Sequence, residues 1–164
     1  MMKFFLCAMA MFCCLSVGFL RAQDDQKTTP VRCMIQMTNY NGEGAYIVIS
    51  VVDSLDTYRE TLHVLGDDPD WYYEIDEWWS YFGRKKRNID GMTGATLSDG
   101  MREVINLNVP EYAIREGHTL RFETAVEDQP YYPAEIEVVL SDSLPPGKLE
   151  GAGYIRYIRL MQPN

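Results

Sequence analysis

Hydrophobic side chains recur at every second position in several segments of this chain. Val31, Cys33, Ile35 and Met37, for example, fall on one face of residues 31–40. Alternation of this kind is typical of a β-strand with one buried side. Residues 45–52 form a β-branched run that is typical of a central strand. Seven segments are expected to be strands: 31–40, 45–52, 58–65, 103–109, 118–126, 134–140 and 154–161.

One stretch has a helical period instead. Its apolar residues recur at spacings of three and four, and they are Trp71, Ile75, Trp78, Trp79 and Phe82. Asp67 or Asp68 is the expected N-cap, Pro69 suits the first turn, and Gly83 is the expected stop. These signals predict a single helix over residues 69–82. An aromatic stripe of this kind more often packs in a core than binds a cofactor.

Together these elements predict a mainly β fold. Seven strands separated by turns, all antiparallel in pattern, favour an Ig-like β-sandwich. We expect the first three strands to form an antiparallel meander, because a turn at residues 41–44 follows the first strand directly. The aromatic-rich helix at residues 69–82 interrupts the strands once.

The first residues have the pattern of an export signal. Lys3 precedes an uncharged apolar run at residues 4–20, and polar Gln23 follows the small residue Ala22. We expect cleavage after Ala22, with cleavage after Gly18 as the alternative. Residues 23–30 would then be a polar leader and residues 31–164 a single domain in the periplasm.

Charge and cysteine content narrow the classes of partner and of chemistry. The formal net charge of −9 argues against nucleic acid as a partner, because nucleic acid is a polyanion. Three of the four cysteines lie in the signal, so Cys33 has no intramolecular partner and is expected to be a buried strand residue. His63 and His118 have no second His or Cys nearby, and they resemble strand residues rather than metal ligands.

A loop rich in small residues, residues 90–98, follows a basic run at residues 84–87. Its candidate functional residues are Asp90, Thr93, Gly94, Ala95, Thr96 and Ser98. Small residues beside a hydroxyl suggest that something bulky comes close to the backbone. No lysine follows the glycines, so the loop is not a phosphate-binding P-loop. Without an adjacent histidine, Thr96 and Ser98 do not indicate a hydrolase.

The segment Asp90-Gly91-Met92-Thr93-Gly94-Ala95-Thr96 resembles the acceptor motif of proteins that carry covalent FMN. The resemblance implies that an ApbE-type flavin transferase takes the FMN half of FAD and joins its phosphate to the hydroxyl of Thr96. Gly94 and Ala95 then have a physical role, because bulk there would keep the transferase from the hydroxyl.

A wider resemblance covers residues 31–127. The Trp78-Trp79 pair and the glutamates and alanine within residues 117–127 are similar to a family of predicted periplasmic domains of unknown function. Such domains occur beside PepSY membrane proteins and flavin transferases, which implies a membrane redox partner of the PepSY or cytochrome type. Residues 104–115 lack the tryptophan and the Gly/Asp-rich turn that this family often has.

The resemblance also implies roles for the other candidates. Trp78 and Trp79 would stack on the isoalloxazine, although core burial is the better expectation for at least one of them. Asp90 would orient the loop or remain a plain turn carboxylate. The basic run 84–87 would meet the phosphate or the transferase, or form a solvated loop. The expected function is therefore that of an exported electron carrier with FMN on Thr96, not an enzyme with its own organic substrate.

Two other functions remain open from the residues. The first is a binding module that grips a peptide or glycan with exposed tyrosines, namely Tyr72, Tyr73, Tyr131 and Tyr132. The second is a small hydrolase, which needs a base near Thr96 or Ser98. His63 and His118 are the histidine candidates for that base.

Overall fold

The computed structural model describes residues 27–83 and 91–163. In chain order the strands are β1 (Thr28–Met37), β2 (Tyr46–Val52), β3 (Tyr58–Leu65), β4 (Thr93–Gly94), β5 (Arg102–Pro110), β6 (Thr119–Ala125), β7 (Tyr132–Val139), β8 (Leu149–Glu150) and β9 (Ile155–Met161). The helical segments are the 3-10 helix η1 (Pro69–Glu74) and the α-helices α3 (Asp76–Phe82) and α4 (Glu111–Arg115).

Two sheets pack face to face, which confirms the predicted β-sandwich. One has the strand order β5-β1-β9-β8 and the other β4-β3-β2-β6-β7. The seven predicted strands are the seven long ones, and β2 is central in its sheet as expected. Cys33 is fully buried between the sheets, and burial raises the pKa of its thiol to about 12. An uncharged thiol of this kind packs as a small apolar side chain, as predicted.

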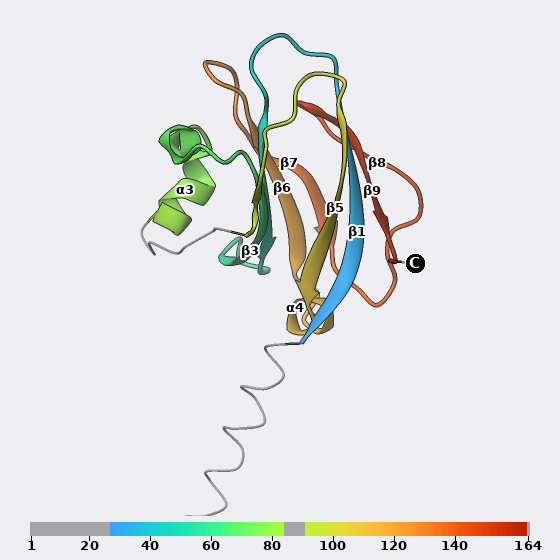
Figure 1. Cartoon of the computed structure of the whole chain (residues 1–164). Coiled ribbons are helices and arrows are strands. Elements are labelled where there is room, and N and C mark those ends of the chain that lie inside the picture. The colour runs from blue at the N-terminus through green and yellow to red at the C-terminus, as the bar shows by residue number, and fades with distance from the viewer. Residues whose placement is uncertain (1–26, 84–90, 164) are drawn as a thin grey trace, which may run out of the picture.

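A helical layer covers the outer face of the five-stranded sheet. Figure 1 shows α3 on the far side of β3 and β6 from β5, β1 and β9. Trp78 of α3 is fully buried, and its ring stacks on Phe82 with a centroid distance of 4.8 Å. Its indole N–H donates a hydrogen bond to the Thr61 hydroxyl of β3 at 2.9 Å. This layer gives the protein a second apolar core besides the one between the sheets.

The expected meander of the first three strands is wrong. β1 pairs with β5 and β9 in the four-stranded sheet, whereas β2 pairs with β3 and β6 in the other. The turn after β1 therefore carries the chain across to the opposite sheet. β1 also begins at Thr28, inside the expected leader 23–30, because Thr28 to Pro30 pair with Pro110 to Asn108 of β5.

The single predicted helix over residues 69–82 is two segments. Ile75 has φ −100° and ψ 67°, outside the helical region, and it separates η1 from α3. A 3-10 turn and an α-turn place apolar residues at nearly the same spacing, so the pattern could not separate them. Asp68 caps η1 by accepting a hydrogen bond from the Asp70 N–H at 3.0 Å. The five-residue helix α4 was not predicted, since it is too short to show a period.

Candidate functional site

Two residues of the loop 90–98, Thr93 and Gly94, form a short strand at the edge of the five-stranded sheet. Thr93 and Gly94 form β4 and pair in parallel with Val64 and Leu65, which corrects the expectation of antiparallel pairing throughout. The Gly66 N–H donates to the Gly94 carbonyl at 2.6 Å. A Cβ on Gly94 would lie 3.1 Å from Cδ2 of Leu65, so a small residue suits this edge.

The second half of the loop is held by the residues that precede β2. Leu97 and Ala45 exchange backbone hydrogen bonds of 2.8 and 3.1 Å. The Tyr40 hydroxyl donates to the Leu97 carbonyl and accepts from the Ala45 N–H at 2.9 Å. Thr96 is therefore fixed from both sides, by β4 before it and by the Leu97 bridge after it.

The hydroxyl of Thr96 faces the backbone of Gly44. A Cβ on Gly44 would lie 2.3 Å from Oγ1 of Thr96 and 2.7 Å from its Cβ, so no side chain fits there as Thr96 now stands. The φ of Gly44 does not lie in the left-handed region, so its backbone conformation alone does not require glycine. Glycine at position 44 is needed for space beside the half-buried Thr96.

Thr96 lies on the wall between two cavities. We call the first, of about 180 Å³, the Trp71 cavity, and its lining is Glu43, Gly44, Tyr46, Trp71, Thr96 and Glu127. We call the second, of about 340 Å³, the His63 cavity, and its lining is His63, Leu65, Gly94, Ala95, Thr96, Leu97, Met101, Glu103 and Ile105. Thr96 therefore borders two cavities whose lining residues differ in chemistry.

Electrostatics differ between the two cavities. Two carboxylates, Glu43 and Glu127, line the Trp71 cavity. Burial, and next the charge of Asp68, raises the pKa of Tyr46 to about 12, so its hydroxyl stays protonated. In the other cavity burial lowers the pKa of His63, against the opposing charge of Glu103. His63 is therefore mainly neutral at neutral pH.

The two tryptophans singled out in the sequence do not line either cavity in the described part of the chain. Trp78 is buried, which confirms the expected core burial of at least one of the pair, and its ring faces Tyr72 and Phe82 rather than a ligand. Trp79 is half-buried on α3, with its ring centroid 6.0 Å from that of Trp78.

The remaining loop candidates have different surroundings. Thr93 is half-buried in β4, Ala95 and Ser98 are exposed, and the Ser98 carbonyl accepts a hydrogen bond from the Met101 N–H at 3.2 Å. Asp90 and the basic run 84–87 lie outside the described residues.

Three residues that the sequence did not single out as site residues lie beside Thr96 instead. Trp71 belongs to the predicted aromatic stripe, for which core packing is the expectation. Glu127 ends the segment 117–127, and Gly44 belongs to a turn. The approach of Gly44 to Thr96 joins positions far apart in the chain, and no local pattern signals it.

The alternative tyrosine surface is wrong in part. Tyr72 is only 3 % exposed and donates its hydroxyl to the Gly66 carbonyl at 3.0 Å. Tyr73 is 55 % exposed, whereas Tyr131 and Tyr132 are half-buried. A binding surface built from all four rings therefore does not exist.

The two histidines lie in different places. His63 shares a cavity with Thr96, but its Nε2 is on the Gly94 side, 3.8 Å from where a Cβ on Gly94 would be. Oγ1 of Thr96 faces Gly44 instead. His118 precedes β6, whose other end, Ala125, pairs with Tyr46 near the Trp71 cavity.

A buried carboxyl lies under the helical layer. Glu123 of β6 is fully buried and accepts hydrogen bonds from the hydroxyls of Tyr58, at 2.8 Å, and Tyr131. Burial raises the pKa of Glu123 to about 7, although both tyrosine hydrogen bonds oppose the shift. The carboxyl is enclosed between the sheet and the helices and lines neither the Trp71 cavity nor the His63 cavity.

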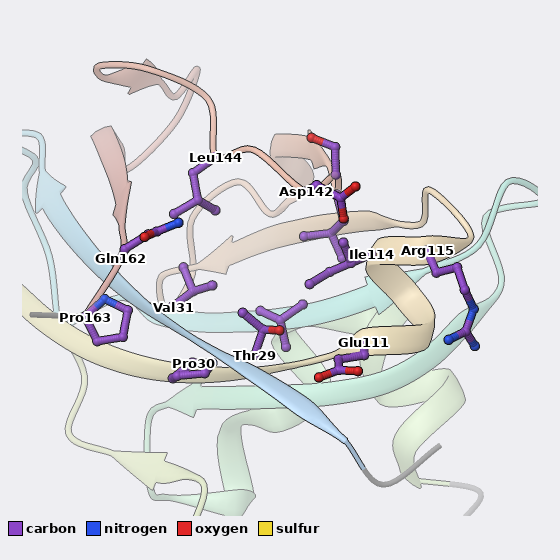
Figure 2. Close-up of a pocket in the computed structure, with 13 residues that line it drawn as sticks. Thr29, Pro30, Val31, Glu111, Ile114, Arg115, Asp142, Leu144, Gln162 and Pro163 are labelled. Carbon is purple, nitrogen blue, oxygen red and sulfur yellow. The ribbon is translucent and has the colours of Figure 1, made fainter. Parts of the chain in front are cut away.

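A larger cavity, of about 620 Å³, lies at the end of the sandwich that carries α4. Figure 2 shows it between Val31 and Leu144, with Glu111, Ile114 and Arg115 on α4. None of the predicted site residues lines it. Within residues 27–83 and 91–163, no three His, Cys, Asp or Glu side chains are grouped to hold a metal ion. The helices of this described part include none that is long and apolar enough to span a membrane.

Comparison with known proteins places the chain in a family. Residues 28–157 match the family model described as predicted periplasmic protein (DUF2271), which agrees with the location expected from the export signal. Comparisons with curated proteins and with solved structures gave no match. The matched residues include nearly all of both sheets, the helical layer and Thr96. The chain therefore belongs to the DUF2271 family of predicted periplasmic proteins.

Proposed function

We infer that this protein is a periplasmic electron carrier that holds FMN through a phosphoester on Oγ1 of Thr96. The observation that carries the proposal is the position of this hydroxyl. Thr96 is fixed between β4 and the Leu97 bridge and borders two cavities, and Gly44, which has no side chain, lets Oγ1 lie against its backbone. The motif resemblance supplies the identity of the group, and the geometry supports its fit.

The attachment is a group transfer without a redox change. Oγ1 of Thr96 forms a bond to the phosphorus on the FMN half of FAD, and the bond from this phosphorus to the bridging oxygen breaks. AMP leaves with that oxygen, and the hydroxyl proton passes to a base of an ApbE-type flavin transferase. A transferase needs its donor within bonding distance of the acceptor oxygen, and the small residues Gly94 and Ala95 that precede Thr96 keep bulk out of this approach.

A covalent bond suits the charge of this site. Reversible binding with a micromolar dissociation constant corresponds to only about −8 kcal/mol, and a dilute exported carrier would often lose its cofactor. The carboxylates of Glu43 and Glu127 would weaken it further, because they repel an anionic phosphate. The phosphoester removes this dependence on affinity.

The bound FMN supplies reversible uptake of two electrons and two protons. The chain positions the group and sets its electrostatic surroundings. Electrons would pass to or from a membrane redox protein of the PepSY or cytochrome type. The protein would therefore act as a relay subunit of an oxidoreductase system.

Co-expression with an ApbE-type flavin transferase tests the attachment. The mature protein should gain the mass of one FMN phosphoester and fluoresce on a denaturing gel. Thr96→Ala should lose both signals, and Thr96→Ser should keep them because it retains a hydroxyl. Thr57→Ala, on the exposed turn before β3, is the matched control and should be modified normally. An unmodified wild type, or flavin that persists on Thr96→Ala, would overturn the proposal.

A further inference from the structure

We propose that the outer face of the four-stranded sheet docks an acidic segment of a partner protein, that is, a short extended run of Asp or Glu side chains. We call this surface the basic face, and its exposed cations are Arg32, Arg102, Lys148, Arg156 and Arg159. Docking at the basic face does not require FMN, so it is tested separately from the proposed function.

The strand register places three arginines on this side of the sheet. Buried residues of β1 alternate with outward-facing ones, which are Arg32, Met34 and Gln36. Residues directly opposite each other in a sheet point to the same side. Met34 lies opposite Arg159 of β9, and Gln36 lies opposite Arg102 of β5. Three neighbouring strands therefore each contribute one arginine to the basic face.

The other two cations lie beside a groove of about 700 Å³ at one end of the basic face. Lys148 and Arg156 line this groove together with Arg102. Nζ of Lys148 lies over the ring of Tyr157, 4.1 Å from its centroid. Nε of Arg102 donates a hydrogen bond to Oε1 of Gln36 at 2.9 Å. Side chains that are already positioned lose less conformational freedom when a partner binds.

The cations of the other sheet have carboxylate partners within the chain. Arg121 of β6 pairs with Asp56 at 2.9 Å and with Glu137 at 2.6 Å. Arg59 of β3 pairs with Asp53 at 3.8 Å. Within residues 27–83 and 91–163, by contrast, none of the five cations of the basic face forms a salt bridge. In a chain with a net charge of −9, such a group of cations indicates a partner that supplies the carboxylates.

Charges of opposite sign gather on the two sides of the molecule. The four strands of the basic face contain two acids, of which Glu103 lies opposite the buried Ile35 and Glu150 lies opposite Tyr157 on the outer face. Residues 67–77, at the helical layer, contain six acids and no Lys or Arg. Figure 1 shows α3 and the four-stranded sheet on opposite sides of the five-stranded sheet. This separation steers an acidic partner towards the basic face.

The spacing of the cations suits an extended acidic segment. Neighbouring strands lie about 4.8 Å apart, so Arg102 on β5 and Tyr157 on β9, with β1 between them, are about 10 Å apart. Lys148 lies over Tyr157, at the far end of this distance. An extended chain rises about 3.3 Å per residue, so about three acidic residues span the groove. Arginine also forms paired hydrogen bonds with carboxylates, which suits Asp and Glu side chains.

The shape of the basic face favours a protein segment over a lipid surface. Peripheral membrane segments bury large apolar side chains among the lipid headgroups. On the basic face Val104 is 46 % exposed, but Tyr157 is half-buried with Lys148 over its ring. A concave groove with cations on its walls therefore binds a narrow acidic chain better than a flat bilayer.

A fluorescently labelled hexaglutamate peptide tests the basic face, with hexaglutamine as the neutral probe. The purified protein should bind hexaglutamate but not hexaglutamine, as measured by fluorescence anisotropy. The affinity should fall as the salt concentration rises from about 0.02 to about 0.3 M, because salt screens exposed charges. Arg156→Gln should lower the affinity roughly threefold, and the double variant with Lys148→Gln about tenfold.

Arg59→Gln is the matched control. It removes the same charge as Arg156→Gln, but from the other sheet, so the affinity should change by less than about 1.5-fold. Arg156 and Lys148 are exposed, so urea denaturation of their variants should match wild type. A loss of binding with an unchanged unfolding midpoint therefore reports on docking rather than on folding.

Three results would overturn the proposal. The first is no binding of hexaglutamate by the wild-type protein. The second is an equal loss in Arg59→Gln and Arg156→Gln, which would make the net charge of the chain responsible. The third comes from vesicles of phosphatidylglycerol and phosphatidylcholine. If the protein binds these vesicles through Lys148 and Arg156 and does not bind hexaglutamate, the basic face binds a lipid surface instead. None of these results bears on the attachment of FMN, which intact mass tests independently.

Discussion

The helical layer and the Thr96 edge, which consists of β4 and the bridge between Leu97 and Ala45, each contain a tryptophan from the same aromatic stretch. In the helical layer this tryptophan packs in a core, whereas at the Thr96 edge it lines a cavity. In the helical layer Trp78 is fully buried and its indole N–H donates a hydrogen bond to the Thr61 hydroxyl. The buried carboxyl of Glu123 accepts hydrogen bonds from two tyrosine hydroxyls. At the Thr96 edge Trp71 is half-buried and lines an open cavity. We conclude that the first region mainly stabilises the fold, whereas the second can change without unfolding it. Stability measurements on variants of both regions test this difference.

The largest loss is expected in the helical layer. Trp78→Ala removes a buried ring and its hydrogen bond to Thr61. The cost for such a truncation is about 3 to 5 kcal/mol in the free energy of unfolding, which urea denaturation measures. A loss below about 1 kcal/mol would show that the layer does not contribute to the cooperative core.

The next effect is a pH dependence that originates at Glu123. Its pKa is raised from 4.5 to about 7, so the folded state holds a proton that the unfolded state has released. The stability from this group is fully present below pH 4.5 and is lost as the pH rises through about 7, a change of about 3 kcal/mol. Urea denaturation from pH 5 to 8 should show unfolding becoming easier as the pH rises.

Glu123→Gln is the control for this pH dependence. The amide cannot titrate, so the slope should flatten, although Glu135 also has a pKa raised by burial and retains part of the trend. Identical slopes in wild type and Glu123→Gln would exclude Glu123 as the source.

A smaller effect is expected from Trp71→Phe. The indole is half-buried and lines an open cavity, and phenylalanine keeps most of its apolar surface. The free energy of unfolding should fall by about 1 kcal/mol or less. A loss as large as that of Trp78→Ala would place Trp71 in the core and remove the contrast between the two regions.

The smallest change in stability is expected for Thr96→Ala. Backbone bonds of Leu97 and Gly94, not the Thr96 side chain, hold this edge. The free energy of unfolding should therefore shift by less than about 0.5 kcal/mol, while flavin attachment is lost. Thermal unfolding of the unmodified protein measures the shift, and a large shift would mean that loss of flavin reflects misfolding.

Local patterns predicted the long strands but not their partners. Alternation located β1 and β3, in which one face is more buried than the other, whereas a β-branched run located β2, which is buried along its whole length. Pairing of β1 with β5 and β9 depends on contacts between distant segments, which period-two patterns do not encode. The parallel contact of β4 with β3 is two residue pairs long and shows no pattern at all.

As with the strands, local patterns indicated one residue of the candidate site but not the residues that the fold places around it. The motif singled out Thr96, and the structure places it on the wall of two cavities. Periodicity could not tell Trp71 from Trp78, because both belong to one stripe and differ only in what the fold places opposite them. The role of Gly44 depends on its contact with Thr96 across the sandwich edge, so it required the structure.

The decisive measurement of flavin attachment is the intact mass of the mature protein after co-expression with a flavin transferase. We expect one FMN phosphoester per wild-type chain, located by peptide mapping at Thr96, and none on Thr96→Ala. A wild-type chain without FMN, or a phosphoester on Ser98 or another hydroxyl, would contradict it.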